Sequence, residues 1–354
     1  MKALYFGTYD RAAPRNTQVV SCLRGAGVRV HELHREVWGR HNWSLGFRQL
    51  ARIIRAERDL AREAEEEADV VIVGYPGHFD MPAARRVARG RPIVFNPLVS
   101  LHDTLVGDRG RFRRRSPAAA VLRAADASAF RTADLVVADT EAHAAFFQAS
   151  FRLDPGRVEV ALVGADEPHF RPGWHPPEPF RVLFVGKLVP LHGLETILAA
   201  ARLVPHVPFT VVGEGQQSDL LATRPPNVEH VAWVQFEDLP DAYRGSGAAL
   251  GIFGTGEKAG RVIPNKVFQA LACARPVVTA DTPAARELLT HETDALLVPP
   301  GDPGALAEAV RRLASDAGLA ERLAEAGRAT YEAHASEDVL GARWRSLLER
   351  VLSR

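Results

Sequence analysis

Residues 180–213 read FRVLFVGKLVPLHGLETILAAARLVPHVPFTVVG. The apolar runs at 180–186 and 209–213 predict two buried strands, and the apolar spacing between them predicts a helix over residues 194–203. A strand, a helix and a second strand in this order form the repeating unit of an α/β fold around a parallel sheet. This stretch therefore places the chain in the α/β class.

The same alternation extends in both directions. Towards the C-terminus we predict strands at residues 228–233, 248–253, 276–280 and 295–298. Towards the N-terminus we predict strands at residues 3–7, 28–33, 69–74, 92–96, 134–138 and 158–163. Helices are predicted at residues 45–68, 118–132 and 141–151, and from Pro303 to the end, where residues 339–352 form an amphipathic helix. The pattern predicts two doubly wound parallel sheets in succession.

A proline-rich segment separates the two halves. Residues 164–173 read GADEPHFRPG, and Pro176, Pro177 and Pro179 follow. Proline and glycine at this density are typical of a connector between domains. We therefore predict two Rossmann-like domains that face each other across a cleft, residues 1–168 and 174–335. Residues 336–354 are predicted to form a helix that packs back on the first domain.

Composition narrows the class of function. The 354 residues are 46% hydrophobic and 25% charged, which is the composition of a globular protein. The formal net charge is only +1, so the chain does not have the excess of basic residues that is typical of a nucleic-acid-binding protein. Cys22 and Cys273 are the only cysteines, which argues against a disulfide framework or a cysteine-rich metal site. No apolar run approaches the roughly 20 residues of a membrane span. We expect a cytoplasmic protein with no metal and no nucleic-acid partner.

Lysine is rare in this chain. The 44 basic residues include only four lysines, Lys2, Lys187, Lys258 and Lys266. A position that keeps lysine against this bias indicates a need for a compact ammonium, unless it persists by chance at a solvated position. Three of the four fall in two short loops, which makes those loops the first candidates for a binding site.

The first of these loops follows the predicted strand at 180–186 and reads VGKLVPLHG over residues 185–193. In doubly wound folds, ligands bind beyond the carboxyl ends of the strands, where a glycine turn and helix amides approach phosphate. Lys187 adds a cation there. The loop lacks both G-x-G-x-x-G and G-K-[ST], so it predicts neither a nicotinamide dinucleotide site nor a P-loop. An ordinary strand-to-helix connection is the alternative.

The second loop reads GTGEKAGRVIPNKVFQALA over residues 254–272 and runs into a predicted helix. Its glycines and the helix start favour an anion, and Lys258, Arg261 and Lys266 surround the same place with positive charge. Gln269 lies one turn beyond Lys266 on the same helix face. A diphosphate fits this loop; solvated loop residues are the alternative for each cation taken singly.

These two loops resemble the donor-binding segments of family-4 retaining glycosyltransferases, also described as glycosyl transferases group 1. The first part of the resemblance lies in Gly186-Lys187 and His192-Gly193. The second part lies in residues 264–272, 275–278 (RPVV), 282–288 (TPAAREL) and 297–303 (LVPPGDP). The N-terminal half matches more loosely, at residues 5–10 (YFGTYD), 100–103 (SLHD) and 139–141 (DTE).

The resemblance implies a GT-B fold and transfer of a sugar from a nucleotide-diphosphate donor to an acceptor hydroxyl, with retention of anomeric configuration and no further cofactor. The acceptor would be a sugar, a lipid-linked or a small molecule. The implied catalytic residues are Lys187, Arg261, Lys266 and His102. The implied donor-binding residues are Gly7, Gly186, Lys187, His192, Glu257, Lys258, Arg261, Asn265, Lys266 and Gln269. The implied acceptor-binding residues are Tyr9, Asp10, Arg11, Arg15, Asn16 and Asp103.

Three positions depart from the family pattern. His192 replaces a lysine, Gln269 replaces a glutamate that binds ribose hydroxyls, and Arg261 stands where a glutamate lies near the donor sugar. These departures leave the base, the sugar and the acceptor open. They also keep two alternatives open: a nucleotide-sugar epimerase of the same architecture, and a non-catalytic descendant that binds a nucleotide.

An arginine-rich run, RGRFRRR, occupies residues 109–115. Such a run either attracts anionic lipid headgroups or a phosphorylated acceptor, or forms a solvated loop. The arginines of residues 45–62 would extend it, but this helix also carries Glu57, Asp59 and the cluster Glu65-Glu66-Glu67. From the sequence, peripheral membrane contact is therefore the less favoured interpretation.

Overall fold

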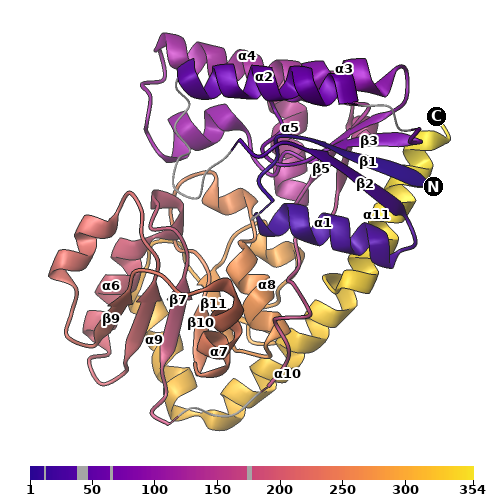
Figure 1. Ribbon diagram of the computed structural model, residues 1–354. Coiled ribbons are helices and arrows are strands. Elements are labelled where there is room, and N and C mark those ends of the chain that lie inside the picture. The colour runs from indigo at the N-terminus through magenta and orange to yellow at the C-terminus, as the bar shows by residue number, and fades with distance from the viewer. Residues whose placement is uncertain (12, 38–46, 64–66, 174–177) are drawn as a thin grey trace. The chain divides into compact units, whose positions relative to one another are not determined.

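A computed structural model describes residues 1–11, 13–37, 47–63, 67–173 and 178–354. The chain divides into two compact units (Figure 1). Unit 1 comprises Met1–Leu162 and Glu337–Arg354, and unit 2 comprises Val163–Ser336. Several predicted features lie outside the described residues: residues 45–46 and 64–66 of the predicted helix, with Glu65 and Glu66 of its acidic cluster, and Pro176 and Pro177 of the connector.

Unit 1 contains a six-stranded parallel sheet in the order β2-β1-β3-β4-β5-β6. Its strands are β1 (Lys2–Gly7), β2 (Arg29–His34), β3 (Val70–Val73), β4 (Ile93–Phe95), β5 (Leu135–Ala138) and β6 (Val158–Val160). Because the chain winds outward in opposite directions from β1 and β3, the topological switch point lies between these two strands. Ligands of doubly wound folds bind at such a point, beyond the carboxyl ends of the strands.

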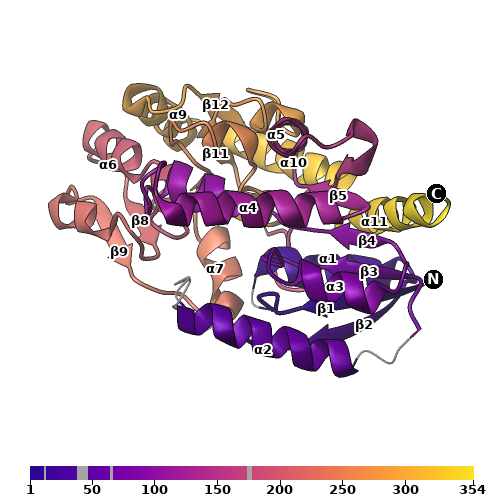
Figure 2. The same cartoon turned by 90° about the horizontal axis from the view of Figure 1, so that it is seen from above.

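Helices cover both faces of this sheet (Figures 1 and 2). One face packs against α2 (Phe47–Glu63), α3 (Met81–Ala88), α4 (Pro117–Thr132) and α5 (Glu141–Phe151). The other packs against α1 (Pro14–Gly25) and α11 (Glu337–Leu352). The C-terminal helix thus belongs to the first unit, where its fully buried Trp344 joins the core formed with α1.

Unit 2 contains a second six-stranded parallel sheet, in the order β12-β11-β10-β7-β8-β9. Its strands are β7 (Val182–Val185), β8 (Phe209–Val212), β9 (Val228–Val231), β10 (Ala248–Leu250), β11 (Val277–Ala280) and β12 (Leu296–Val298). Its helices are α6 (Leu194–Leu203), α7 (Leu239–Arg244), α8 (Asn265–Ala272), α9 (Pro303–Ser315) and α10 (Ala317–His334). Here the switch point lies between β7 and β10.

Local chemistry explains where several helices begin. Ser116 accepts a hydrogen bond from the amide of Ala119 at 3.2 Å, and Asp302 accepts one from Ala305 at 3.0 Å. Proline occupies the first position of both helices, α4 and α9, where its missing N–H removes no helical hydrogen bond. A capping oxygen followed by proline therefore starts both helices where the sequence predicts.

The two sheets confirm the predicted doubly wound α/β fold. After β4, His102 precedes a short helical segment of π type, Asp103–Asp108, that the sequence did not predict. The second unit begins at Val163, so the predicted connector at 164–173 belongs to that unit. Among the described helices, none has the length and apolar character that crossing a bilayer requires.

Candidate functional site

The loops that follow β7 and β10 in unit 2 are joined by main-chain hydrogen bonds. Phe253 N donates to the carbonyl oxygen of His192 at 3.1 Å, and Gly254 N donates to that of Leu191 at 3.2 Å. Gly193 has a φ of 69°, and a Cβ there would lie 2.6 Å from the carbonyl carbon of Phe253. Only glycine permits this approach, so the sequence brings both predicted loops to the switch point.

Lys266, in the first turn of α8, is buried beneath the first of these loops. Its side chain is 6% exposed, and its Nζ lies 4.1 Å from the centre of the Phe184 ring. Nζ has no hydrogen-bond partner among the described residues. A Cβ on Gly186 would lie 2.7 Å from this nitrogen and 3.0 Å from Cε1 of His192. The ammonium therefore lies beside a gap that exists because residue 186 is glycine.

Such an arrangement is unfavourable without a ligand. Burial lowers the pKa of Lys266 well below its usual value because the charged form loses its hydration. The Phe184 ring offsets part of this loss through a cation–π contact. A buried donor without a partner still costs about 1–3 kcal/mol, more when it is charged. An anion placed at the gap would supply the missing partner and would raise the pKa of Lys266.

The other predicted donor residues of unit 2 differ in how far they are exposed to solvent. Lys258 is buried, Lys187 is exposed, and Asn265 opens α8. Arg261 Nη1 lies 3.5 Å from Oε2 of Glu257, and the Glu257 side chain is 94% exposed. The structure thus brings Gly186, His192 and Lys266 together, whereas Glu257 points to solvent. Within the described residues, no three His, Cys, Asp or Glu side chains are placed to hold a metal ion.

Gln269 lies one turn beyond Lys266 and is held by a residue that the sequence analysis missed. Its Oε1 accepts a hydrogen bond of 3.1 Å from the hydroxyl of Tyr243, on α7. Burial raises the pKa of Tyr243 well above its usual value, so this hydroxyl remains a donor. No motif marks Tyr243 in the sequence; its role follows only from the packing of α7 against α8.

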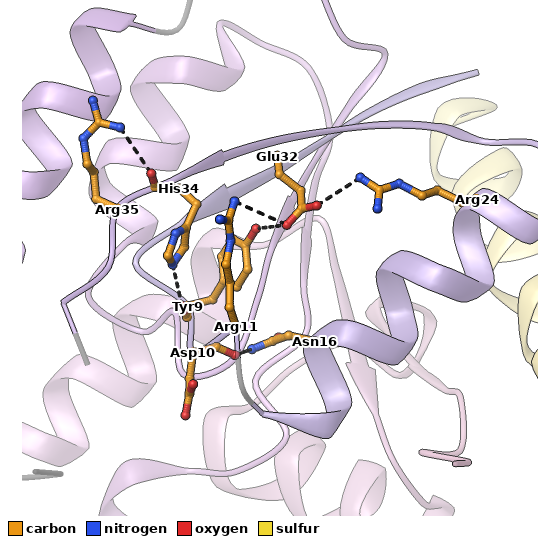
Figure 3. A network of polar contacts seen from close by, with 8 residues as sticks. All are labelled: Tyr9, Asp10, Arg11, Asn16, Arg24, Glu32, His34 and Arg35. Carbon is orange, nitrogen blue, oxygen red and sulfur yellow. Dashed lines mark hydrogen bonds and ion pairs between the residues drawn. The ribbon is translucent and has the colours of Figure 1, made fainter. Parts of the chain in front are cut away.

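In unit 1, the predicted acceptor residues Tyr9 and Arg11 belong to a network around Glu32, in the middle of β2 (Figure 3). The Tyr9 hydroxyl donates to Oε2 of Glu32 at 2.7 Å, and Arg24 donates to Oε1 at 3.0 Å. Arg11 Nη2 lies 3.6 Å from the same carboxylate. These four side chains line a pocket of about 410 Å³. Arg11 and Arg24 keep more than half of their side-chain surface exposed there.

Arg15 and Asn16, which the resemblance implies bind the acceptor, lie in the first turn of α1 and in the interior, each 1% exposed. Asn16 donates to the carbonyl oxygens of Asp10 and Tyr75 at 2.7 Å and so joins the loops after β1 and β3. Arg15 donates to Asn96 at 2.9 Å and to the carbonyl of Ala161 at 2.8 Å. These hydrogen bonds give both side chains a structural role, although Nη2 of Arg15 has no hydrogen-bond partner among the described residues.

Gly7 ends β1 with a φ of 126°, and a Cβ there would lie 2.4 Å from Oδ2 of Asp80. Asp80 accepts hydrogen bonds from Thr8 N at 2.8 Å and from Thr8 Oγ1 at 2.9 Å. Burial raises the pKa of Asp80 to about 6 although both hydrogen bonds lower it. The space beside Gly7 is thus filled by a protein carboxylate.

His102 and Asp103 are positioned by Asp126, a buried residue of α4. Asp126 accepts hydrogen bonds from Leu101 N and His102 N, both at 2.9 Å, and from Ser100 Oγ at 2.7 Å. Burial and the neighbouring positive charges lower the pKa of His102, so its imidazole is neutral at pH 7. No sequence motif marks Asp126, although it is the only acidic residue of an alanine-rich helix.

Family models match both halves of the chain. Residues 179–316 match the model described as glycosyl transferases group 1, and residues 7–164 match the model described as glycosyl transferase 4-like domain.

Lipopolysaccharide core biosynthesis glycosyltransferase LpsD of Rhizobium meliloti is 26% identical over 182 residues, 51% of this chain and 52% of that protein. D-inositol 3-phosphate glycosyltransferase 2 of Catenulispora acidiphila is 32% identical over 209 residues, 51% of this chain and 48% of that protein. The chain spans about half the length of the curated relatives it matches.

Solved structures resemble the whole chain. Sucrose-phosphate synthase from Thermosynechococcus elongatus aligns with a TM-score of 0.79 and 17% identity, covering 99% of both chains. HepE from Anabaena, solved in complex with UDP-glucose, aligns with a TM-score of 0.69 and 17% identity, covering 99% of this chain and 100% of that one. At these identities the likeness concerns the fold.

Proposed function

The chain belongs to the glycosyl transferases of group 1 and has their two-domain GT-B fold, and from this we propose that it transfers a sugar from a nucleoside-diphosphate donor to an acceptor hydroxyl with retention of anomeric configuration. The observation that carries the proposal is the buried, unpartnered ammonium of Lys266 beside Gly186, at the switch point of unit 2. A diphosphate supplies the negative charge that this ammonium lacks.

In the proposed reaction, unit 2 stabilises the leaving group. Negative charge grows on the diphosphate as its bond to the anomeric carbon breaks, so a fixed cation beside it favours the transition state over the ground state. Lys266 is proposed to be this cation, and Lys187 and Arg261 are proposed to assist it. Gln269, fixed by Tyr243, is proposed to contact the ribose hydroxyls.

Retention is proposed to need no protein nucleophile and no cofactor. The acceptor oxygen forms its bond to the anomeric carbon on the face that the phosphate leaves, and the acceptor proton passes to the departing phosphate oxygen. Neutral His102 is proposed to accept a hydrogen bond from the donor sugar. HepE has been solved in complex with UDP and with UDP-glucose, which supports a uridine nucleotide as the first donor to test.

The acceptor is proposed to be a sugar, carried by a lipid or bearing a phosphate. The relatives support this class of acceptor, since LpsD is a lipopolysaccharide core biosynthesis glycosyltransferase and others are D-inositol 3-phosphate glycosyltransferases. The exposed guanidinium groups of Arg11 and Arg24 offer contacts to a phosphate, and the carboxylate of Glu32 beside them offers a hydrogen-bond acceptor for sugar hydroxyls.

The test is steady-state kinetics with a panel of nucleotide sugars and phosphorylated or lipid-linked sugar acceptors. Lys266→Met and Lys187→Ala should each lower turnover about a hundredfold, or roughly 3 kcal/mol, with a smaller change in donor affinity. Lys2→Ala, at the only lysine outside the two loops, is the matched control. Near-normal turnover in both loop variants, an inverted product by NMR, or conversion of the donor to an epimer without acceptor would each refute the proposal.

A further inference from the structure

Asp126, on α4, is the centre of a buried network in unit 1. Its side chain has no exposed surface. The carboxylate accepts hydrogen bonds from Ser100 Oγ at 2.7 Å and from the main-chain nitrogens of Leu101 and His102, both at 2.9 Å. Asp103 N in turn donates to Ser100 Oγ at 3.0 Å. Because two of the donors to Asp126 are consecutive main-chain groups, its carboxylate fixes the path of the backbone into His102.

A further contact to Asp126 comes from a different loop. His78 lies between β3 and α3, and its fully buried side chain places Nε2 3.4 Å from Oδ1 of Asp126. The ring is held in this direction by an edge-on contact with Phe95, 5.1 Å between ring centres, and by a tilted contact with Phe130, 5.9 Å. Nε2 forms no hydrogen bond with any other described residue. The carboxylate is therefore the group that this nitrogen faces.

The segment that carries His78 is itself tied to the loop after β1. Asp10 N donates to the carbonyl oxygen of Tyr75 at 3.0 Å, and Asp80 accepts two hydrogen bonds from Thr8. The contact between His78 and Asp126 therefore connects the loop after β4, which leads to His102, with the loops after β1 and β3. All three loops lie at the carboxyl edge of the sheet, where ligands of doubly wound folds bind.

A buried carboxylate is a costly way to stabilise a fold. The charge loses its hydration, and well-packed apolar side chains of similar volume often give equal or greater stability. A buried network of hydrogen bonds does, however, hold each of its donors in one position. The donors to Asp126 include the main chain at Leu101 and His102, so the network determines where the His102 side chain begins.

We propose that Asp126 and His78 are positioning residues for sugar transfer. Asp126 holds the main chain at His102, and His78 sets the place of Asp126 relative to the loops after β1 and β3. Neither side chain touches the substrate, because both are enclosed in the interior of unit 1. The inference rests on the proposed function, in which His102 accepts a hydrogen bond from the donor sugar.

The test is steady-state kinetics of His78→Leu and Asp126→Asn, with nucleotide affinity measured separately by calorimetry. Leucine fills space but has no donor, and the asparagine amide turns N–H groups towards other N–H groups. Displacing a catalytic group by about 1 Å costs up to about a hundredfold in rate, so kcat should fall about tenfold in His78→Leu and about a hundredfold in Asp126→Asn. The dissociation constant of the nucleoside diphosphate, which unit 2 binds in the proposed reaction, should stay unchanged. His78→Gln, which keeps an N–H near the position of Nε2, should recover most of the rate.

Two comparisons separate positioning from a purely structural role. In a His102→Ala background, the substitutions at His78 and Asp126 should cause almost no further loss of kcat, because they act through the missing imidazole. The matched control is His143→Leu, at another fully buried histidine, whose Nδ1 lies 2.6 Å from a carboxylate oxygen of Asp139. This control should lower the melting temperature to a similar extent but keep the wild-type kcat.

Ser100→Ala provides a milder variant that removes one hydroxyl and almost no volume. Its kcat should fall about fivefold, and the loss should again vanish in the His102→Ala background. Hydrogen exchange gives a readout that does not need activity: the Leu101 and His102 amides should exchange faster in Ser100→Ala and Asp126→Asn than in the wild type.

The outcomes distinguish the two levels of the argument. A wild-type chain that transfers no sugar refutes the proposed function, and the positioning role with it. With an active wild type, the positioning role alone is overturned by normal kcat in Ser100→Ala and the other folded variants, by losses of the same size in the His102→Ala background, or by an equal loss of kcat in His143→Leu.

Discussion

Replacing Lys266 by methionine should stabilise the ligand-free protein and at the same time abolish nucleotide binding. Methionine has nearly the same length, needs no hydrogen-bond partner, and keeps a favourable contact with the Phe184 ring. The variant therefore removes a buried charge without leaving a cavity. A residue retained only for stability would show the opposite effect, because its loss would weaken the fold.

The expected gain follows from the environment of Nζ. An unsatisfied buried donor costs about 1–3 kcal/mol, so a gain of about 2 kcal/mol is expected for the variant. In a unit of this size, about 2 kcal/mol corresponds to a rise of about 4–8 °C in the melting temperature of unit 2. For the wild type, the unfolded chain binds this proton more tightly than the folded one, because burial lowers the folded-state pKa. Wild-type stability should therefore rise with pH, and the advantage of the variant should shrink as the pH approaches about 10.

The assay is thermal unfolding of wild type, Lys266→Met and the control Lys2→Met, each with and without a nucleoside diphosphate. At about 100 times its dissociation constant, the nucleotide should stabilise the wild type and the control by about 2.7 kcal/mol and should scarcely affect Lys266→Met. If Lys266→Met melts below the wild type without ligand, or if the nucleotide stabilises both proteins equally, the reasoning fails.

Three further predictions concern the surrounding structure. Gly186→Ala should weaken nucleotide affinity at least tenfold in calorimetry, because the added methyl group would occupy the space next to the buried ammonium of Lys266. The control Gly25→Ala should leave the affinity unchanged, because a Cβ at residue 25 meets nothing within 4 Å. Tyr243→Phe should raise the donor KM about fivefold by releasing Gln269, as expected for the loss of one hydrogen bond. Because the folded-state pKa of Asp80 is raised to about 6, the free energy of unfolding should fall as the pH rises from about 4 to about 6, and Asp80→Asn should flatten this slope in a pH series of unfolding curves.

Most of the strands were predictable because they are short buried runs bounded by turn residues, although β2 and β9 are only partly buried. The strand predicted at residues 209–213, for example, corresponds closely to β8, Phe209–Val212. Helices α3 and α7 were not predicted as separate elements, because each has at most two turns and too few residues for an apolar period to emerge. Such short helices depend on the sheet against which they pack.

In the site, the sequence located the loops but not the roles of all side chains within them. Gly186 and Lys266 could be predicted as site residues because each lies in a loop or helix start that follows a predicted strand. In a doubly wound fold, such loops lie at the carboxyl edge of the sheet, where ligands bind. The burial of Arg15 was not predictable, since an arginine in a polar turn looks the same whether it faces solvent or reaches carbonyl groups far along the chain. Asp126 and Tyr243 were missed for the same reason: each acts on a segment that only the tertiary fold brings near.

We expect the nucleotide to bind unit 2 and not unit 1, because the switch points of the two units differ. In unit 1, Asp80 fills the space beside Gly7 and accepts two hydrogen bonds from Thr8, so the protein satisfies its own polar groups there. In unit 2, the corresponding space beside Gly186 contains an ammonium with no hydrogen-bond partner among the described residues. An anion adds little binding free energy at a site whose polar groups are already paired. It adds most at a site that buries an unpaired charge. Nucleotide affinity should therefore depend strongly on Lys266 and remain unchanged in Asp80→Asn, and an equal loss in both variants would contradict this assignment.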